Sequence, residues 1–408
     1  MRYIQREMEK VVLEAAGGFP SVVLTGPRRA GKTFLLRHLF PRASYHLFED
    51  PDIVSRFRAD PRGFFESVRP PAILDEIQNV PEIFAYVRGR IDATPRRTGQ
   101  WFLTGSQEAG LMKGVTESMA GRAAVLSLWP MSARETDKVG LLRGGYPEVL
   151  ARPRSAPLWF ASYLQTYLER DVRSISAIHD LATFRRFMAL VASRHGQILN
   201  KSDISASLGI SGPGVGKWID ILEATAQILL VPPYFENFGK RLIKSPKIYI
   251  ADSGLACHLL GIVSQEELEK SPFLGPLFEG FVASEIVKSQ IFAGRRKEIW
   301  FFRDQQGLEV DFLFRSAGGR SCLLEAKATR TPVPAMAGRL VRLARSFAKR
   351  RGGDASPDSY VVHRPARSGP STFALAPGVR AIPWPIFVRD TLAGRPPGAR
   401  GRRPARPP

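Results

Sequence analysis

The stretch Gly26-Pro-Arg-Arg-Ala-Gly31-Lys32-Thr33 decides the fold of the first part of this chain, because it matches G-x-x-x-x-G-K-[ST] at every fixed position. The apolar run SVVLTG (21–26) leads into it, and FLLRHLF (34–40) continues it at helical spacing. A strand, a glycine-containing loop and a helix in this order form a P-loop. Its glycines let backbone N–H groups curl around phosphate oxygens, and the N-terminus of the helix offers its positive end to the same anion.

A carboxylate pair completes the pattern. Asp75 and Glu76 follow the run PPAIL (70–74), at the carboxyl end of a predicted strand, where ligands bind in parallel sheets. Lys32 is expected to reach the β- and γ-phosphates of ATP, Thr33 and Asp75 to hold Mg²⁺, and Glu76 to polarise the attacking water as general base. The sequence therefore predicts nucleotide hydrolysis. The residues expected to contact the nucleotide are Gly26, Pro27, Arg28, Arg29, Ala30, Gly31, Lys32, Thr33, Phe34, Asp75 and Ser106.

Two more positions are candidates for contact with the γ-phosphate. Ser106, or Thr104 in its place, ends the apolar run QWFLTGS (100–106) and could contact the phosphate or orient the water. The alternative is an ordinary strand-to-loop turn. Arg122, just before AAVLSL (123–128), could sense the γ-phosphate of its own or a neighbouring subunit. The alternative there is a solvated surface arginine.

Composition narrows the cellular context and the partner. The chain has 408 residues, enough for two or three domains, and an apolar fraction of 44% that is ordinary for globular proteins. Its net charge of +21 draws polyanions, so DNA is the expected partner. Cys257 and Cys322 lie far apart, which excludes a disulfide framework and suits a reducing compartment. With no apolar signal segment at the start and no run approaching the ~20 apolar residues of a membrane span, a cytoplasmic protein without membrane contact is expected.

The middle of the chain contains a helix-turn-helix candidate, KSDISASLGISGPGVGKWIDILEA (201–224). The residues expected to pack inward are Ile204, Leu208, Ile210, Trp218, Ile221 and Leu222, and those expected nearer solvent are Ser211, Lys217 and Asp220. A strand at ILLVPPYF (228–235) and the basic residues Lys240, Arg241, Lys244 and Lys247 would add a wing that contacts DNA phosphates. A helical lid or a protein-contact surface is the alternative.

Near the C-terminus, carboxylates and a lysine recur with the spacing of a metal-dependent hydrolase. Asp311 lies in LEVDFLF, and Glu325 and Lys327 lie in CLLEAKA, both predicted strands. Alternation places Glu325 and Lys327 on one face, and a hairpin through 315–320 can bring Asp311 beside them. Carboxylates bind Mg²⁺ or Mn²⁺, the metal activates water, and the lysine steadies the developing charge. A Glu325–Lys327 salt bridge without catalysis is the alternative.

In order, GPRRAGKT, ILDEIQN, FLTGSQ, MAGRAA, GGYPEVL, YLERDV, FEGFVASEIVK, FRDQQGLEVDFLF and LLEAKAT make the sequence resemble a prokaryotic family of AAA-type P-loop ATPases over about residues 1–385. Members carry a C-terminal domain of unknown function. The resemblance implies a parallel sheet of strand order 5-1-4-3-2. It also raises the expectation of an oligomer in which a neighbour supplies an arginine, with Arg122, Arg170 and Arg173 as candidates.

The C-terminal order of helix, three strands, helix and strand, with D…ExK spacing, resembles the PD-(D/E)xK nuclease superfamily. This resemblance gives Asp311, Glu325 and Lys327 the catalytic positions and Glu285 the place of a helical carboxylate. It implies metal binding by Glu285, Asp311 and Glu325. Cleavage does not follow from the fold alone, since relatives of an enzyme can keep its scaffold without its activity.

Together these patterns predict an α/β chain with five segments. They are an AAA-type ATPase core (1–135), a helical lid or linker (136–195), a winged-helix-like domain (196–262), a PD-(D/E)xK nuclease-like domain (263–389) and a disordered Arg/Pro-rich tail (390–408). Two functions follow. The first is an ATP-dependent enzyme that acts on or binds DNA and cuts it at the C-terminal site. The second is a nucleotide-gated switch that binds DNA or a protein and whose nuclease-like domain is inactive.

Overall fold

The computed structural model describes residues 3–105, 118–167, 181–234, 245–350, 356–366 and 372–396. The chain forms two compact units. Unit 1 comprises Met1–Leu190, Lys201–Leu229 and Ile291–Arg296, and unit 2 comprises Val191–Asn200, Leu230–Gln290 and Lys297–Pro408. In the part of the chain described, no helix is long and apolar enough to cross a membrane.

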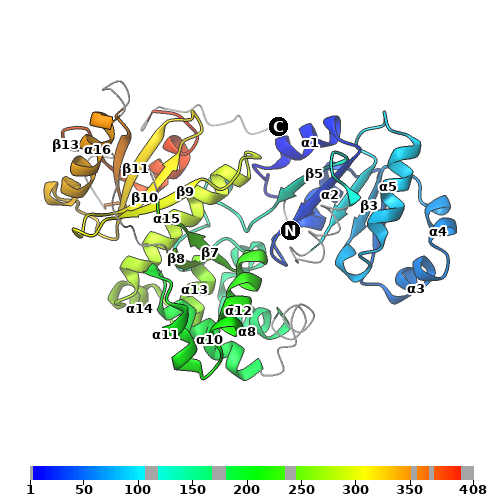
Figure 1. Ribbon diagram of the computed structural model, residues 1–408, viewed down its shortest axis with the longest axis horizontal. Coiled ribbons are helices and arrows are strands. Elements are labelled where there is room, and N and C mark those ends of the chain that lie inside the picture. Colours follow the sequence, from blue (N-terminus) through cyan, green and yellow to red (C-terminus); the bar gives the residue numbers. More distant parts are fainter. Residues whose placement is uncertain are drawn as a thin grey trace. The chain divides into compact units, whose positions relative to one another are not determined.

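A five-stranded parallel sheet forms the centre of unit 1 (Figure 1). From one edge to the other its strands are β2 (Ser44–Leu47), β3 (Ala72–Asp75), β4 (Trp101–Thr104), β1 (Ser21–Thr25) and β5 (Ala123–Ser127). This order is the predicted 5-1-4-3-2, which is therefore confirmed. The three central strands are fully buried and the two edge strands only partly, as expected for a sheet covered by helices on both faces.

The helices of this α/β core are α1 (Glu9–Gly18), α2 (Lys32–Leu39), α3 (Pro51–Ala59), α4 (Pro61–Ser67) and α5 (Ile83–Ala93). Asp50 and Asp60 begin α3 and α4 in the same way. Each carboxylate accepts a hydrogen bond from a backbone N–H of the first turn, and each is followed by a proline suited to that turn. The positions of both helices thus follow from local sequence.

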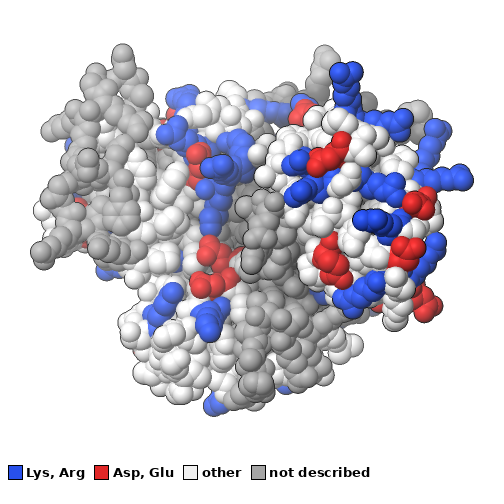
Figure 2. Space-filling view, turned by 45° about the vertical axis from the view of Figure 1, so that its right-hand side comes forward, with Lys and Arg blue, Asp and Glu red and all other residues white. Residues whose placement is uncertain are grey.

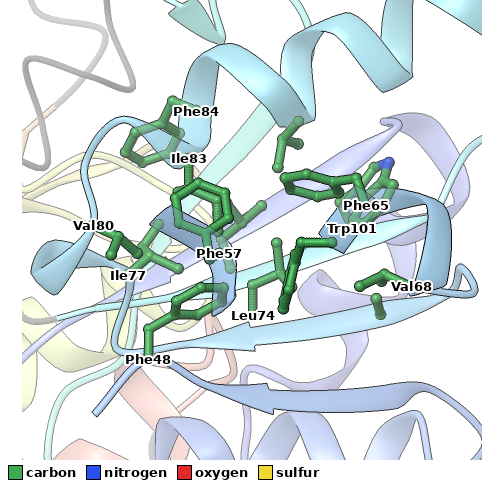
Figure 3. Packing of buried hydrophobic residues seen from close by; sticks show 14 of the residues in the cluster. Phe48, Phe57, Phe65, Val68, Leu74, Ile77, Val80, Ile83, Phe84 and Trp101 are labelled. Atoms are coloured by element: carbon green, nitrogen blue, oxygen red, sulfur yellow. The ribbon is translucent and has the colours of Figure 1, made fainter. Parts of the chain in front are cut away.

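An aromatic core packs against one face of this sheet. Phe48, Phe57, Phe65 and Trp101 lie together in Figure 3 beside β3 and the helix that carries Ile83 and Phe84. Phe57 meets Phe48 edge-on at 5.7 Å and Phe65 at 6.2 Å between ring centroids. Such pairs add about 0.5–1.5 kcal/mol each beyond burial of their area. Because Leu74 of β3 belongs to this core, the end of β3 is held firmly.

The rest of unit 1 is helical. It contains α7 (Pro147–Ala151), α8 (Ala156–Tyr167), α10 (Leu181–Ser193), α11 (Lys201–Leu208) and α12 (Gly212–Ala224). Gly209, at φ 67°, turns the chain between α11 and α12, and the Ser211 hydroxyl caps α12 by accepting from Gly214 N at 3.2 Å. Of the residues predicted to pack inward, Ile204, Ile221 and Leu222 are buried and Leu208, Ile210 and Trp218 partly so, while Ser211, Lys217 and Asp220 are exposed as predicted.

A six-stranded mixed sheet forms the centre of unit 2. Its order is β13 (Phe373–Ala376), β14 (Val379–Pro383), β12 (Asp358–His363), β11 (Ser321–Lys327), β10 (Glu309–Arg315) and β9 (Ile299–Arg303). Strands β9, β10 and β11 form an antiparallel meander, and β12 runs parallel to β11. The chain order α15 (Leu274–Ile291), β9–β11, α16 (Gly338–Arg350), β12 is the predicted succession of elements. One final strand was expected after the second helix, whereas the structure has three strands there, β12, β13 and β14.

Smaller elements complete unit 2. They are α13 (Ser253–Leu259), α14 (Gln265–Lys270), the short helix α17 (Trp384–Ile386) and a three-stranded sheet in which β8 (Lys247–Ile250) lies between β6 (Gln197–Ile198) and β7 (Ile228–Val231). On one face of the large sheet, α16 packs through Leu340, Leu343 and Phe347 into a core with Leu313 and Leu323 of the meander.

Candidate nucleotide site and carboxylate cluster

The P-loop of the structure joins β1 to α2, as predicted. Gly26 and Gly31 have φ values of 133° and 98°, a region that residues with a Cβ rarely adopt. A Cβ on Gly26 would also lie 2.1 Å from the carbonyl oxygen of Leu128. Gly26 is therefore required twice, by its own backbone conformation and by the close approach of the chain after β5.

Lys32 lies inside the loop. Its side chain is buried, and its ammonium donates hydrogen bonds to the carbonyl oxygens of Gly26 at 3.0 Å and Pro27 at 3.1 Å. Both of these acceptors are neutral carbonyl oxygens. The position and charge of the ammonium thus fit a nucleotide phosphate, which would form a stronger, charge-assisted bond than a carbonyl does.

Asp75 is the last residue of β3, and its carboxylate accepts hydrogen bonds from three hydroxyl groups. Thr33 Oγ1 lies 3.0 Å from Asp75 Oδ1 and 2.9 Å from Oδ2, Tyr45 donates to Oδ2 at 2.7 Å, and Thr104 donates to Oδ1. Burial, followed by the hydrogen bond to Asp75, raises the pKa of Tyr45. The structure thus brings the predicted pair Thr33 and Asp75 together, and it places Thr104, the alternative to Ser106, against the same carboxylate. Tyr45 was not anticipated from the sequence.

Glu76 follows Asp75 with φ 58°, the left-handed region that is unusual for a residue other than glycine. Its backbone N–H donates to Thr104 Oγ1 at 3.3 Å, which fixes the turn after β3. Its carboxylate lies 3.9 Å from the guanidinium of Arg28, which also lies 3.2 Å from Glu49. Arg28, predicted to contact nucleotide, therefore connects the P-loop with the predicted general base.

Arg6 contacts the P-loop through its buried side chain, and no sequence pattern predicted this role. It is 4% exposed. Its guanidinium donates to Ala30 O of the P-loop at 2.8 Å, to Trp129 O at 2.7 Å and to the buried carboxylate of Glu135 at 2.9 Å. A single buried cation thus ties the N-terminal segment, the P-loop and the chain after β5 to one another.

Of four further residues predicted to contact the nucleotide or a neighbouring subunit, one is described by the structure and three are not. Phe34 is 57% exposed on α2, with its ring 5.7 Å from that of Tyr3. Ser106, Arg170 and Arg173 lie outside the residues that the structure describes.

Arg122 does not reach the nucleotide site of its own chain, so the prediction that it senses the γ-phosphate of its own subunit is wrong. Residue Ala123 pairs with Ser21 at the amino end of the sheet, whereas the P-loop follows Thr25 at the carboxyl end. Four residues of strand separate the two edges, about 13 Å. Arg122 instead forms a bidentate pair with Asp92, at 2.6 and 3.2 Å, on an exposed surface.

In unit 2 the structure brings Asp311, Glu325 and Lys327 together on β10 and β11. Lys327 Nζ lies 2.5 Å from Glu325 Oε2 and 3.5 Å from Asp311 Oδ2. Asp311 Oδ2 also accepts from the backbone N–H of Ala326 at 2.9 Å. The register of β10 against β9 shifts between Val310 and Leu313, so Asp311 lies in a β-bulge, a device that re-aims side chains at the ends of sheets.

The helical carboxylate that faces this cluster is Glu279, and the prediction of Glu285 is corrected. Glu279 Oε1 accepts from Lys247 Nζ at 3.0 Å and from the Tyr249 hydroxyl at 2.6 Å, and it interacts electrostatically with Asp311. Glu285 is buried and pairs with Lys288 at 3.0 Å. Six residues along a helix amount to a rotation of about 240°, so the two glutamates point to different sides.

Lys247 also differs from its prediction. It is 4% exposed and lies between Glu279, at 3.0 Å, and Glu309, at 2.8 Å, rather than on an exposed basic wing. The other wing residues, Lys240, Arg241 and Lys244, lie outside the described part of the chain. Lys247 therefore compensates two partly buried carboxylates and is not available to a DNA phosphate.

The carboxyl groups of Glu279 and Glu325 in this cluster have raised pKa values. Burial, reinforced by the neighbouring Asp311, raises the pKa of Glu325 to about 8 and that of Glu279 to about 7. Although burial opposes it, the carboxylates around Lys247 raise the pKa of its ammonium. Glu325 is 1% exposed, and its Oε1 has no hydrogen-bond partner among the described residues. Among those residues, no three His, Cys, Asp or Glu side chains converge as a ready metal cage.

The surface shown in Figure 2 carries both signs of charge. Lys and Arg side chains are interspersed with Asp and Glu over the part drawn at the right. Some exposed arginines of unit 1 pair with carboxylates, such as Arg58 with Glu82 and Arg88 with Asp92. The excess of +21 is thus not one continuous basic patch on the face shown.

Comparisons with known proteins find similar sequences and one similar structure. A model of an AAA domain matches residues 18–136, and two models of domains of unknown function, DUF8612 and DUF4143, match residues 138–266 and 274–387. Proteins described as uncharacterized, Rv2008c of Mycobacterium tuberculosis and Mb2031c of Mycobacterium bovis, are each 33% identical over 320 residues, covering 77% of this chain and 71% of theirs. Among solved structures, the Walker-type ATPase PABY2304 of Pyrococcus abyssi is 17% identical, with a TM-score of 0.43, over 63% of this chain and 96% of that one.

The fold and the match define residues 18–136 of unit 1 as an AAA-type P-loop ATPase domain. The chain belongs to the family of the two mycobacterial proteins, whose relationship to it extends over most of both lengths. The expected C-terminal domain of unknown function is confirmed by the match at 274–387.

Proposed function

We propose that this protein hydrolyses ATP at the edge of the parallel sheet where the P-loop and β3 meet, and that DNA is its partner. One observation carries the proposal for hydrolysis. The Thr33 hydroxyl and the Asp75 carboxylate are within hydrogen-bond distance, with Lys32 preceding one and Glu76 following the other. Hydrolysis needs phosphate binding, a metal site and a base, and these four residues supply all three.

The residues present fit ATP and Mg²⁺. Lys32 would exchange its carbonyl partners for phosphate oxygens, and Thr33 and Asp75 would hold Mg²⁺, which neutralises charge on the phosphates when bound. Glu76 would accept a proton from the attacking water. Thr104 contacts Asp75 and the backbone of Glu76 at once, so it can keep the metal-binding and base positions in register.

ATP turnover by the full chain tests this function. It is measured with Mg²⁺ alone and then with single-stranded, duplex or branched DNA. Turnover that depends on Lys32 and rises with one form of DNA supports both parts of the proposal. Turnover equal in wild type and Lys32→Ala would refute hydrolysis at this site, and turnover unaffected by every DNA would separate the ATPase from the proposed partner.

Two features support DNA as partner. The net charge of +21 favours polyanions, and α11 and α12 form a helix pair whose second member exposes Lys217. A surface for protein contact is the competing use of such a pair. Affinity for DNA that falls steeply with salt supports phosphate contact. DNA affinity unchanged by salt and by nucleotide would contradict it.

A second candidate function, cleavage of DNA in unit 2, is favoured by the Asp311–Glu325–Lys327 cluster. Mg²⁺ is commonly held by one or two carboxylates, with water and substrate phosphate completing its shell. Asp311 and Glu325 fit that mode, and the unpartnered Oε1 of Glu325 is a free acceptor, whereas a three-carboxylate site that includes Glu285 does not form. Lys327 would orient water or steady charge on the phosphate.

Plasmid DNA incubated with Mg²⁺ or Mn²⁺ and ATP tests cleavage. Nicking by wild type that is lost in Asp311→Ala supports the second function. An Asp137→Ala variant, which removes the carboxylate of an exposed aspartate of unit 1, controls for purification and for loss of one negative charge. Equal nicking in wild type and Asp311→Ala would leave the binding switch with an inactive nuclease-like domain as the function of unit 2.

A further inference from the structure

Helix α16 is strongly basic on one side. Its sequence, GRLVRLARSFAKR, carries Arg339, Arg342, Arg345, Lys349 and Arg350, and it has no Asp or Glu. The opposite side is fixed in the core of unit 2 by Leu340, Leu343 and Phe347, each nearly inaccessible. Because the apolar side is buried against the sheet, the basic side must face away from it. Figure 1 shows α16 beside β11.

Arg339, Arg342 and Arg345 form a row on that side. Each is three residues from the next, so they advance about 4.5 Å along the axis per step and lie within an arc of about 120°. All three are exposed, and none forms an ion pair with a carboxylate of the described residues. Other arginines of unit 2 do: Arg320 pairs with Asp358, Arg330 and Arg364 with Glu269, and Arg389 with Asp390.

Stability of the helix does not explain this row. Arg339 lies in the first turn, where the helix dipole disfavours a positive charge and favours Asp or Glu. No residue of α16 offers the carboxylate three or four positions away that would relieve the repulsion between the arginines. No residue of the helix itself therefore compensates the row, and Arg342 and Arg345 form no ion pair with a described carboxylate, which indicates that the row is available to an external anion.

The row begins beside the carboxylate cluster. Leu323, Glu325 and Lys327 alternate onto one face of β11, and Leu323 packs in the same core as Leu340 and Leu343 of α16. Arg339 is close enough to interact electrostatically with both Glu309 and Glu325. An anionic chain lying along the row would therefore have one end at Glu325 and Lys327.

We propose that Arg339, Arg342 and Arg345 bind the phosphodiester backbone of DNA and align it with the Asp311–Glu325–Lys327 cluster. Guanidinium groups bind phosphate in a bidentate manner, and a row of them matches a chain of regularly repeated charges. An acidic membrane surface is a poorer match, because membrane-surface helices insert their apolar side and that of α16 is buried. The inference deepens the DNA part of the proposed function and does not depend on ATP hydrolysis.

The test is the affinity of the full chain for a short fluorescent DNA duplex, measured over a salt series. The triple variant Arg339→Gln, Arg342→Gln, Arg345→Gln is compared with Arg62→Gln, Arg96→Gln, Arg97→Gln. The control triple removes the same charge from exposed arginines of unit 1 that form no ion pair with described carboxylates. The α16 triple is expected to bind about 10- to 100-fold more weakly near 0.1 M salt. The slope of log K against log salt should fall by about 3, and by about 1 for Arg342→Gln alone.

Other outcomes overturn the proposal. Equal losses in the two triple variants would show a general effect of net charge, and unchanged affinity and slope in the α16 triple would exclude the row as a DNA contact. Binding to phosphatidylserine vesicles that falls in the α16 triple, with DNA binding intact, would assign the row to a membrane. ATP turnover is measured in parallel, so that failure of the ATPase proposal and failure of this one give different results. Circular dichroism checks folding, and the single variant Arg342→Gln repeats the test if the triple is unfolded.

Discussion

Thr33 and Asp75 are joined across 42 residues of sequence, with the Thr33 hydroxyl 2.9 Å from one carboxylate oxygen of Asp75 and 3.0 Å from the other. The bond connects the start of α2 to the end of β3. Both elements are fixed independently, α2 by the P-loop glycines and β3 by its place between β2 and β4. The fold itself thus holds together the two residues that we propose as Mg²⁺ ligands.

Replacing Lys32 by Ala should lower kcat/KM for ATP on the order of 100- to 1,000-fold, because a preorganised donor to the transferring phosphate is lost. Steady-state turnover with Mg²⁺ measures it. Lys10→Ala is the matched control, since Lys10 is an exposed lysine of α1 whose side chain is 85% accessible. Equal activity of the two variants would mean that Lys32 has no part in the reaction.

Replacing Glu76 by Gln should lower kcat about 100- to 10,000-fold while leaving ATP affinity nearly unchanged, since the amide keeps the shape of the side chain but cannot take the proton of water. Single-turnover hydrolysis and equilibrium ATP binding separate the two effects. Glu66→Gln, at an exposed position of α4, controls for loss of one carboxylate. A loss of binding rather than turnover would assign Glu76 a structural role through Arg28.

The sequence predicted unit 1 well because its signals are local. The P-loop needs its glycines where the backbone takes φ values of 133° and 98°, so the motif specifies a conformation as well as a composition. Asp75 could be placed at a strand end for a similar reason, since its strand is short and entirely buried. The contact of Tyr45 with Asp75 was not predicted, because a single tyrosine on an edge strand belongs to no recognisable sequence motif. Its relation to Asp75 comes from the pairing of β2 with β3.

In unit 2 the helical carboxylate was misassigned for a physical reason. Nearly all of α15 from Leu277 to Gln290 is buried, so hydrophobic periodicity cannot say which side faces the sheet, and Glu279 and Glu285 are equivalent in sequence. Lys247 was misplaced because its partners, Glu279 and Glu309, lie 32 and 62 residues further along the chain. A basic residue in a basic stretch gives no sign that distant carboxylates will bury it.

Replacing Arg6 by Ala should destabilise unit 1 by about 3–5 kcal/mol, since it leaves the buried Glu135 carboxylate without its cation. Urea denaturation measures the loss. Arg6→Ala with Glu135→Ala should recover part of it, because no charge is then left unpaired in the interior. If Arg6→Ala costs less than about 1 kcal/mol, the pair is not a structural support of the P-loop.

Replacing Glu325 by Gln should change the pH dependence of stability in a defined direction. Burial, with Asp311 nearby, raises the pKa of Glu325 from 4.5 to about 8 in the folded protein. The folded state therefore binds a proton that the unfolded state releases, and the contribution of Glu325 to stability is fully present below pH 4.5 and lost as the pH rises toward and through 8.

The glutamine side chain mimics the protonated acid and has no proton to lose. The variant should thus gain stability relative to wild type as the pH rises from 5 to about 8, as the unfolding midpoint of unit 2 at each pH would show. Glu279, with a pKa near 7, titrates in the same range in both proteins, so the difference between them isolates Glu325. Glu266→Gln, at an exposed position of α14, should show no such trend. A gap between wild type and Glu325→Gln that stays constant with pH would mean that Glu325 is ionised throughout, held so by Lys327.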